Sequence, residues 1–261
     1  MSLPICVTCG VQYAAEREDC PICDDPRQYV GLDGQQWTTL HELRGGHKNL
    51  IRDEGELVGI GTEPKFAIGQ RALLVPHSDG NILWDCVTLL EAETEREVES
   101  RGGLHAIAIS HPHYYSAMVE WAHAFDCPVW LHEDDREWVM RDDPKLHFWS
   151  GPTYDLGDGM TLVRCGGHFA GGTVLHRGND LLTGDIVQVI PDRGWVSFMY
   201  SFPNFIPLPE AEIRSIEAAL EPFDYETIYG AWWGTVIPAD GKAIVKRSAQ
   251  RYIDALNGQL P

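Results

Sequence analysis

The most informative stretch of the sequence is Ala106-Ile107-Ala108-Ile109-Ser110-His111-Pro112-His113-Tyr114-Tyr115. Its first four residues are small or β-branched and apolar, which predicts a buried strand, and a turn containing Pro112 follows. Sheet-based folds place ligand sites just beyond the carboxyl ends of such strands. Two imidazoles two positions apart can point at one ion. We therefore predict that His111 and His113 bind a metal.

The N-terminus carries two C-x-x-C pairs, formed by Cys6, Cys9, Cys20 and Cys23. Each pair predicts a tight turn whose two thiolates reach one ion, and two pairs close a tetrahedral site with no open position. We expect residues 1–30 to form a structural zinc module that resembles a zinc ribbon or a rubredoxin-like knuckle and depends on the metal to fold. Iron instead of zinc, a redox dithiol pair and two disulfides remain as alternatives.

The rest of the chain divides by its pattern. Residues 31–55 are polar and rich in glycine, which predicts an irregular linker with a short helix around 38–43. From residue 56 to 261, strand-like and helix-like runs alternate, as is typical of an α/β protein. Strands are expected at 56–60, 65–68, 72–76, 81–84 and 106–110, with helices at 91–101, 115–125, 133–140, 209–220 and 239–256.

Composition narrows the class of partner. The chain has 20 Lys and Arg against 39 Asp and Glu, a formal charge of -19. Nucleic-acid binding relies on cationic side chains, so the charge disfavours a nucleic-acid partner. The sequence has no apolar run long enough to span a membrane, and its N-terminus lacks the pattern of a secretory signal. We expect a cytoplasmic protein that acts on a small molecule.

Three further residues occupy positions that suit a site. Asp85 ends the expected strand at 81–84, and Asp185 follows an apolar run, 181–183, through Thr183-Gly184. His168 lies among four glycines in the segment 165–172, where the backbone can approach a bound group closely.

Taken in order, these residues form a set of four motifs, which are Asp85, His111-Pro112-His113, Gly167-His168 and Gly184-Asp185. The set resembles the metallo-β-lactamase-fold superfamily, over roughly residues 56–256. The resemblance implies a four-layer αββα sandwich. It also implies that His111, His113 and His168 hold a first metal, that Asp185 is the bridging carboxylate, and that Asp85 orients the histidine loop.

The departures from the family pattern concern the second metal. The motif H-x-H-x-D-H places an Asp and a His where this chain has Tyr115 and Ser116. The region that matches the family's late histidine, residues 229–234, contains none. We therefore expect a single ion at the histidines, zinc by preference, with iron as the alternative.

A zinc-bound water of lowered pKa predicts a hydrolase of small esters, thioesters or lactones. Asp185 would be either the fourth ligand or the base, and Tyr115, or else Tyr114, would donate a hydrogen bond to the developing oxyanion. His132 ends another expected strand and is a further candidate ligand. A non-catalytic metal-binding protein and a mononuclear iron redox enzyme are the alternatives. The aromatic, proline-rich segment 195–209 predicts a loop beside the site, and a contact between copies in a homo-oligomer would have the same pattern.

Overall fold

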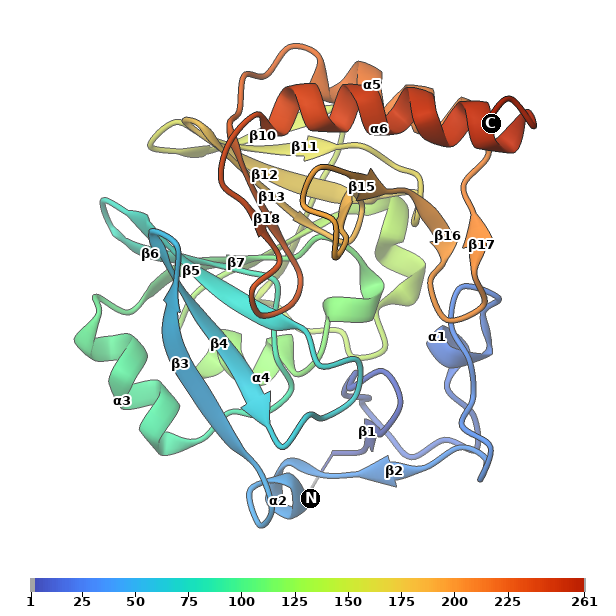
Figure 1. Ribbon diagram of the computed structural model, residues 1–261. Coiled ribbons are helices and arrows are strands. Elements are labelled where there is room, and N and C mark those ends of the chain that lie inside the picture. The colour runs from blue at the N-terminus through green and yellow to red at the C-terminus, as the bar shows by residue number, and fades with distance from the viewer. Residues whose placement is uncertain (1–2, 261) are drawn as a thin grey trace.

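Two β-sheets face each other, and helices cover their outer surfaces (Figure 1). The computed structural model describes residues 3–260. Within that range, no helix is long and apolar enough to cross a membrane.

The first sheet has seven strands in the order β3 (Lys48–Glu54), β4 (Leu57–Glu63), β5 (Arg71–His77), β6 (Gly80–Trp84), β7 (Leu104–Ala108), β8 (Val129–His132) and β9 (Leu146–Trp149). Strands β3 to β6 pair antiparallel, whereas β6 to β9 run parallel. Parallel neighbours need crossover connections, which α3 (Ala92–Ser100), α4 (Met118–Ala124) and the 3₁₀ helix η2 (Glu133–Trp138) provide.

The second sheet has six strands in the order β10 (Thr153–Gly157), β11 (Met160–Arg164), β12 (Thr173–Arg177), β13 (Asp180–Gly184), β18 (Thr227–Gly230) and β19 (Val236–Ile237). Helices α5 (Glu210–Leu220) and α6 (Gly241–Leu256) cover its outer face (Figure 1). Two small antiparallel pairs follow β13 in the chain, β14 (Gln188–Val189) with β15 (Val196–Ser197) and β16 (Met199–Ser201) with β17 (Ile206–Pro207).

The side chains of β7 show how the sheets stack. Ala106 and Ala108 belong to the apolar cluster between the two sheets, together with Leu175 of β12. Ile107 belongs to the outer cluster, together with Trp121 of α4. This alternation is the period-2 pattern of a strand buried on both faces. The predicted four-layer αββα sandwich is therefore confirmed.

The N-terminal region contains β1 (Ile5–Cys6), α1 (Pro21–Asp24), β2 (Trp37–Thr38) and α2 (Leu40–Leu43). It packs against the outer layer of the first sheet, and its four cysteines share a buried cluster with Trp121. Two hydrogen bonds accompany this packing: the backbone N–H of Gln12 donates to the carbonyl of Ser116 at 2.9 Å, and the Thr88 hydroxyl donates to the carbonyl of Gly10 at 2.9 Å. The region is thus part of the main body of the protein.

Two expectations need correction. The expected linker 31–55 ends in β3, which pairs along its whole length with β4, so the sheet begins at Lys48 and not at residue 56. The run 65–68 is an irregular loop between β4 and β5, because Ala67 adopts a positive φ of 50° that breaks an extended strand. Periodicity did not reveal β3, because its side chains are mostly polar and exposed or half-buried.

Candidate metal centre and its cavity

His111 and His113 lie on the segment that leaves the carboxyl end of β7. The segment turns into the 3₁₀ helix η1 (Pro112–Tyr114), which Pro112 favours because its φ is already helical. The turn places the two imidazole rings next to each other, with their centroids 5.2 Å apart. Both side chains are buried.

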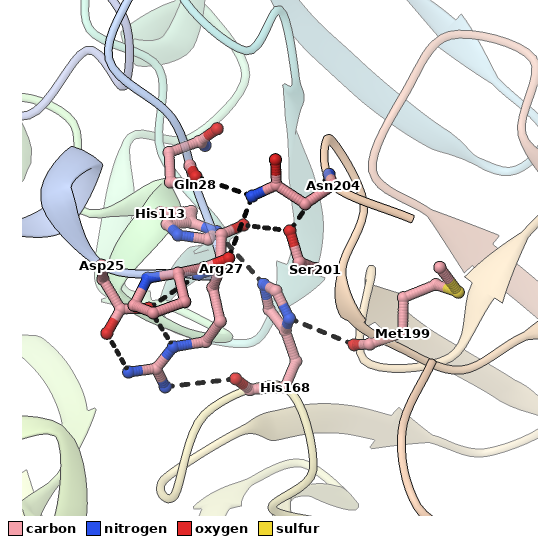
Figure 2. Close-up of polar contacts among 9 residues, drawn as sticks. Asp25, Arg27, Gln28, His113, His168, Met199, Ser201 and Asn204 are labelled. Atoms are coloured by element: carbon pink, nitrogen blue, oxygen red, sulfur yellow. Dashed lines mark hydrogen bonds and ion pairs between the residues drawn. The ribbon is translucent and has the colours of Figure 1, made fainter. Parts of the chain in front are cut away.

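His168 reaches the same place from the second sheet, on the glycine-rich loop between β11 and β12. Gly167 before it has φ +79°, and a Cβ there would lie 2.9 Å from Ile216. The ring donates through Nδ1 to the carbonyl of Met199 at 3.2 Å, so its Nε2 lone pair faces Nδ1 of His113 at 3.1 Å (Figure 2). One ligand atom from each of the three histidines lies within 4.8 Å of the others.

Asp85 lies behind His111 and contacts it through Ser110. Oδ1 of Asp85 accepts the backbone N–H of Ser110 at 2.8 Å, and the Ser110 hydroxyl lies 2.9 Å from Nδ1 of His111. Gly184 makes room for this contact, since a Cβ there would lie 2.6 Å from the Ser110 hydroxyl oxygen. Sequence analysis did not single out Ser110, because a serine next to a histidine carries no signal of its own.

Asp185 follows β13 and completes the polar wall. Its Oδ1 lies 3.3 Å from Nε2 of His111 and has no hydrogen-bond partner in residues 3–260. It is not part of the group of histidine atoms that lie within 4.8 Å of one another. Burial raises the pKa of Asp185 to about 7, against a smaller lowering by the Tyr114 hydroxyl. A buried carboxyl group with a raised pKa therefore lies beside the histidines.

The three histidines are neutral in this environment. Burial lowers the pKa of His111 and His113 well below the usual value and that of His168 to about 4. The positive charge of Arg27 lowers all three pKa values further. Neutral imidazole is the form that binds a metal.

The side chains fit an ion. Nε2 of His111 and Oδ1 of Asp185 are buried polar atoms without a partner among residues 3–260, which is uncommon in folded proteins. Two imidazole nitrogens on one tetrahedral zinc, each bonded at roughly 2.0–2.1 Å, lie about 3.3 Å apart. The 3.1 Å between His113 and His168 is close to that separation.

A cavity of about 180 Å³ opens onto His113, His168 and Asp185. The N-terminal region supplies much of its opposite wall, and the other residues come from the β4–β5 loop, the segment 199–204 and the segment after β18. The lining outside the site residues is Thr8, Arg27, Gln28, Tyr29, Lys65, Ala67, Ile68, Phe202, Pro203 and Trp232. Sequence analysis missed the N-terminal contribution, because nothing in residues 24–30 indicates where the fold places them.

The other candidate residues have different surroundings. The Tyr115 hydroxyl donates to the carbonyl of Asp135 at 3.5 Å, and Tyr115 is not among the described residues that line the cavity, so its surroundings do not fit the expected oxyanion role. Tyr114 is the phenol beside the centre, with its ring 4.4 Å from that of His111. His132 uses both ring nitrogens on backbone groups, accepting from the N–H of Asp134 and contacting the carbonyl of Gly151 at 3.1 Å, which leaves neither nitrogen for an ion.

The four cysteines form a second, closed cluster, in which one sulfur from each residue lies within 4.8 Å of the others. Sγ of Cys6 is 3.6 Å from Sγ of Cys23, and Sγ of Cys9 is 3.7 Å from Sγ of Cys20. A disulfide requires about 2.05 Å, whereas sulfurs bonded at roughly 2.3 Å to one tetrahedral ion lie about 3.8 Å apart. The alternative of two disulfides is therefore wrong for this structure, and the cluster has the geometry of a metal site.

A third group of potential ligands, His77, Asp79 and His105, lies near the β5–β6 turn. The two imidazole rings are stacked, with centroids 4.5 Å apart and planes 8° from parallel. Lone pairs in the planes of parallel rings do not converge on one point. This group is consequently a poorer fit to an ion than the two buried clusters.

Two facing sheets with outer helices and a histidine cluster at their edge define the metallo-β-lactamase fold. The chain is similar in structure to DIM-1 metallo-β-lactamase exposed to ceftazidime, with a TM-score of 0.61 and 15% identity over 80% of this chain and 98% of that one. It is also similar to the metallo-β-lactamase FIM-1 from Pseudomonas aeruginosa in its mono-zinc form, with a TM-score of 0.58 and 14% identity over 82% and 97% of the two chains. At these identities the likeness is one of fold.

The chain belongs to the same family as the uncharacterized protein YmaE of Bacillus subtilis (strain 168). The two sequences are 50% identical over 268 residues, covering 98% of this chain and 97% of YmaE. No model of a known protein family matches the chain.

Proposed function

We propose that this protein is a metal-dependent hydrolase of a small ester, thioester or lactone, with one ion held by His111, His113 and His168. The observation that carries the proposal is the convergence of three buried, neutral imidazoles at a small cavity. An unpaired carboxylate oxygen of Asp185 lies beside them. Zinc at this position would lower the pKa of a bound water toward about 7 and so supply a nucleophile at neutral pH.

The chain's own residues supply the other parts of the proposed mechanism. The unpaired Oδ1 of Asp185 can take a proton from the attacking group and return it to the leaving group. Its place outside the group of converging histidine atoms favours the role of base over that of fourth ligand. Tyr114, whose ring lies 4.4 Å from that of His111, is the donor that we propose for the oxyanion.

A single ion is supported by the residues at the places of the family's second-metal ligands. Tyr115 points to Asp135, and the Ser116 hydroxyl is engaged with Gln70 and with the carbonyl of Cys86. Trp232 lies in the region of the late histidine and lines the cavity as an apolar wall. The FIM-1 structure, described as the mono-zinc form, is an example of this fold with one zinc.

We further propose that the four-cysteine cluster holds a structural zinc ion in an N-terminal module of residues 1–30. Four sulfurs leave no position open for a substrate. The Tyr13 hydroxyl lies 2.9 Å from Sγ of Cys20, and the Gln35 amide donates to Sγ of Cys6 at 3.2 Å. Donors of this kind favour thiolate over thiol, and thiolate is the form that binds a metal.

The test is the metal content per chain, measured on the wild type and on the double variant His111→Ala, His113→Ala, together with hydrolysis of small esters, thioesters and lactones. We expect two zinc ions in the wild type, one in the variant, and hydrolysis only by the former. The matched control is the double variant His41→Ala, His176→Ala, which should retain both ions and full activity. Iron that is lost with the histidines would favour redox chemistry, and metal without turnover would favour a binding protein.

A variant that retains all of the wild-type metal would show that His111 and His113 are not ligands and would refute the proposal.

A further inference from the structure

The segment that follows α1 lies directly against the histidine centre (Figure 2). Cys20 and Cys23 of the four-cysteine cluster lie at the start and inside of α1, and Arg27 comes four residues after Cys23. Although Arg27 lines the cavity, its guanidinium is occupied by groups of the protein.

Asp25 sets the orientation of Arg27. Nε and Nη2 of Arg27 donate to the two carboxylate oxygens of Asp25 at 2.6 and 2.9 Å, and the backbone N–H of Arg27 donates to Oδ1 at 2.9 Å. Both side chains are largely buried, at 14% and 12% exposure, where a two-pronged ion pair has a single geometry. The pair also neutralises the guanidinium, which weakens it as a binding site for an anionic substrate.

The guanidinium of Arg27 also contacts the loop that carries His168, through one N–H and through its flat face. Nη1 of Arg27 donates to the backbone carbonyl of His168 at 3.3 Å. The guanidinium lies 3.9 Å from the centroid of the Phe169 ring. Phe169 in turn packs against all three histidine rings, at centroid distances of 4.9 to 5.4 Å. Arg27 therefore contacts one proposed ligand directly and the others through one aromatic ring.

The segment 199–204 closes this arrangement from the other side. The Ser201 hydroxyl donates to the carbonyl of Arg27 at 3.1 Å, and the Asn204 amide donates to the carbonyls of Pro26 and Gln28 at 3.0 Å each. The same segment supplies the Met199 carbonyl that accepts from Nδ1 of His168. The backbone of residues 26–28 and the ring of His168 are thus held by one short stretch of chain (Figure 2).

We propose that Arg27 is a positioning residue that couples the two clusters: the four-cysteine cluster orders residues 24–28, and Arg27 then holds the His168 loop in its metal-binding geometry. The inference rests on the proposed role of His168 as a ligand. It goes beyond that role because it makes the N-terminal module a part of the histidine centre. Groups that orient metal ligands typically change metal affinity by about tenfold to a hundredfold.

The first experiment measures the affinity of the histidine centre for zinc in Arg27→Gln and Arg27→Lys. The method is competition with a chromophoric chelator, with the cysteine cluster filled throughout. Both variants should bind that ion about tenfold more weakly or worse, because lysine lacks the planar fork that pairs with Asp25 and stacks on Phe169. The control is Arg247→Gln, since Arg247 also donates to a backbone carbonyl, that of Gly194, and also lies over an aromatic ring, that of Trp195. It should leave the affinity unchanged.

The second experiment tests the coupling. Cys9→Ser should weaken binding of the histidine-centre ion in the wild-type background but should add little in the Arg27→Gln background, because both changes release the same loop. Hydrogen exchange of residues 165–172 gives a readout that needs no ion at the histidines. In protein with only the cysteine cluster filled, Arg27→Gln should speed exchange there, whereas Arg247→Gln should not.

Equal affinity and equal exchange in wild type and Arg27→Gln would overturn the inference and leave the proposed hydrolase intact. A raised KM with unchanged metal affinity would also overturn it, because Arg27 would then contact the substrate. If the wild type binds no ion at its histidines, the proposed function fails and so does the coupling of metal sites, whatever the exchange data show.

Discussion

The four-cysteine cluster and the three-histidine cluster are both buried, yet they are built in opposite ways. All four cysteines come from one short stretch near the N-terminus, and their sulfurs close on one another. The histidines come from two sheets, are 55 residues apart between His113 and His168, and leave a cavity open on one side. A closed site of local residues suits a structural ion, whereas an open site between two sheets suits chemistry.

The comparison also separates how each site is held. Two side-chain donors, from Tyr13 and Gln35, support the cysteine sulfurs from within the N-terminal region. The histidines depend on distant residues: Asp85 acts through Ser110, Met199 binds His168, and Arg27 reaches across from the N-terminal region. The cysteine site is therefore held mostly by residues near it in the sequence, while the histidine centre requires both sheets.

The largest effect should come from breaking the closed cluster. Cys20→Ser should lose the structural ion and unfold much of residues 3–30, because binding of structural zinc in small peptides is worth about 10–16 kcal/mol. Metal content and limited proteolysis measure this. The control Cys127→Ser changes a buried thiol outside both clusters and should retain both ions. A Cys20→Ser protein with full metal and unchanged proteolysis would contradict a structural role.

The next effect concerns the open cluster. Asp185→Asn should slow ester hydrolysis by about a thousandfold, because the amide cannot accept the proton, while the three histidines keep their ion. Steady-state kinetics and metal content on the same sample measure both. Asp180→Asn, at the other end of β13, is the control and should have wild-type activity. Loss of the ion in Asp185→Asn would show instead that Asp185 is the fourth ligand.

A smaller effect tests how the His168 loop is held. Asp135 accepts the N–H of Gly171 at 2.8 Å, and burial raises the pKa of Asp135 to about 7. The folded state thus binds the carboxyl proton of Asp135 more tightly than the unfolded state does. As pH rises from about 4 to 7 the protein therefore loses the stability that this proton contributes, up to about 4 kcal/mol. Asp135→Asn still accepts from Gly171 but cannot ionise.

The variant should therefore gain stability relative to the wild type between pH 5 and 8, as urea unfolding at several pH values would measure. If the difference in unfolding free energy between the two proteins stays constant over this range, the pKa of Asp135 is not raised in the folded protein.

The smallest effect concerns the close approach behind His111. Gly178 and Gly184 have nearly the same positive φ, +56° and +55°, but a Cβ meets nothing within 4 Å at Gly178 and lies 2.6 Å from Ser110 at Gly184. Gly178→Ala should cost about 1 kcal/mol for backbone strain alone, and Gly184→Ala about 1–3 kcal/mol more for the clash. Urea unfolding measures both. Equal costs would mean that the approach of Ser110 to β13 is not tightly packed.

Much of this arrangement could be predicted from local patterns. The two cysteines of each C-x-x-C pair are three positions apart and the histidines 111 and 113 are two apart, so the chain between them is too short to separate them. The fold followed from the order of motifs and from the resemblance they carry. Periodicity located most strands of the first sheet but missed β3, whose side chains are mostly polar, and wrongly made a strand of residues 65–68, where Ala67 has a positive φ.

Neighbouring tyrosines show where pattern reasoning stops. Tyr114 and Tyr115 are adjacent and chemically identical, and the turn of η1 sends one to the histidines and the other to Asp135. Their order in the chain does not distinguish these directions.

By itself, then, the sequence determined the cysteine cluster, the pair His111 and His113, and the kind of fold that brings His168 and Asp185 to them. Tertiary structure alone decided which groups hold those ligands, above all the contact of Arg27 with the carbonyl of His168, 141 residues away. The physical reason is chain length: spacing restricts residues that are near in sequence, whereas contacts between distant residues are set by how layers pack.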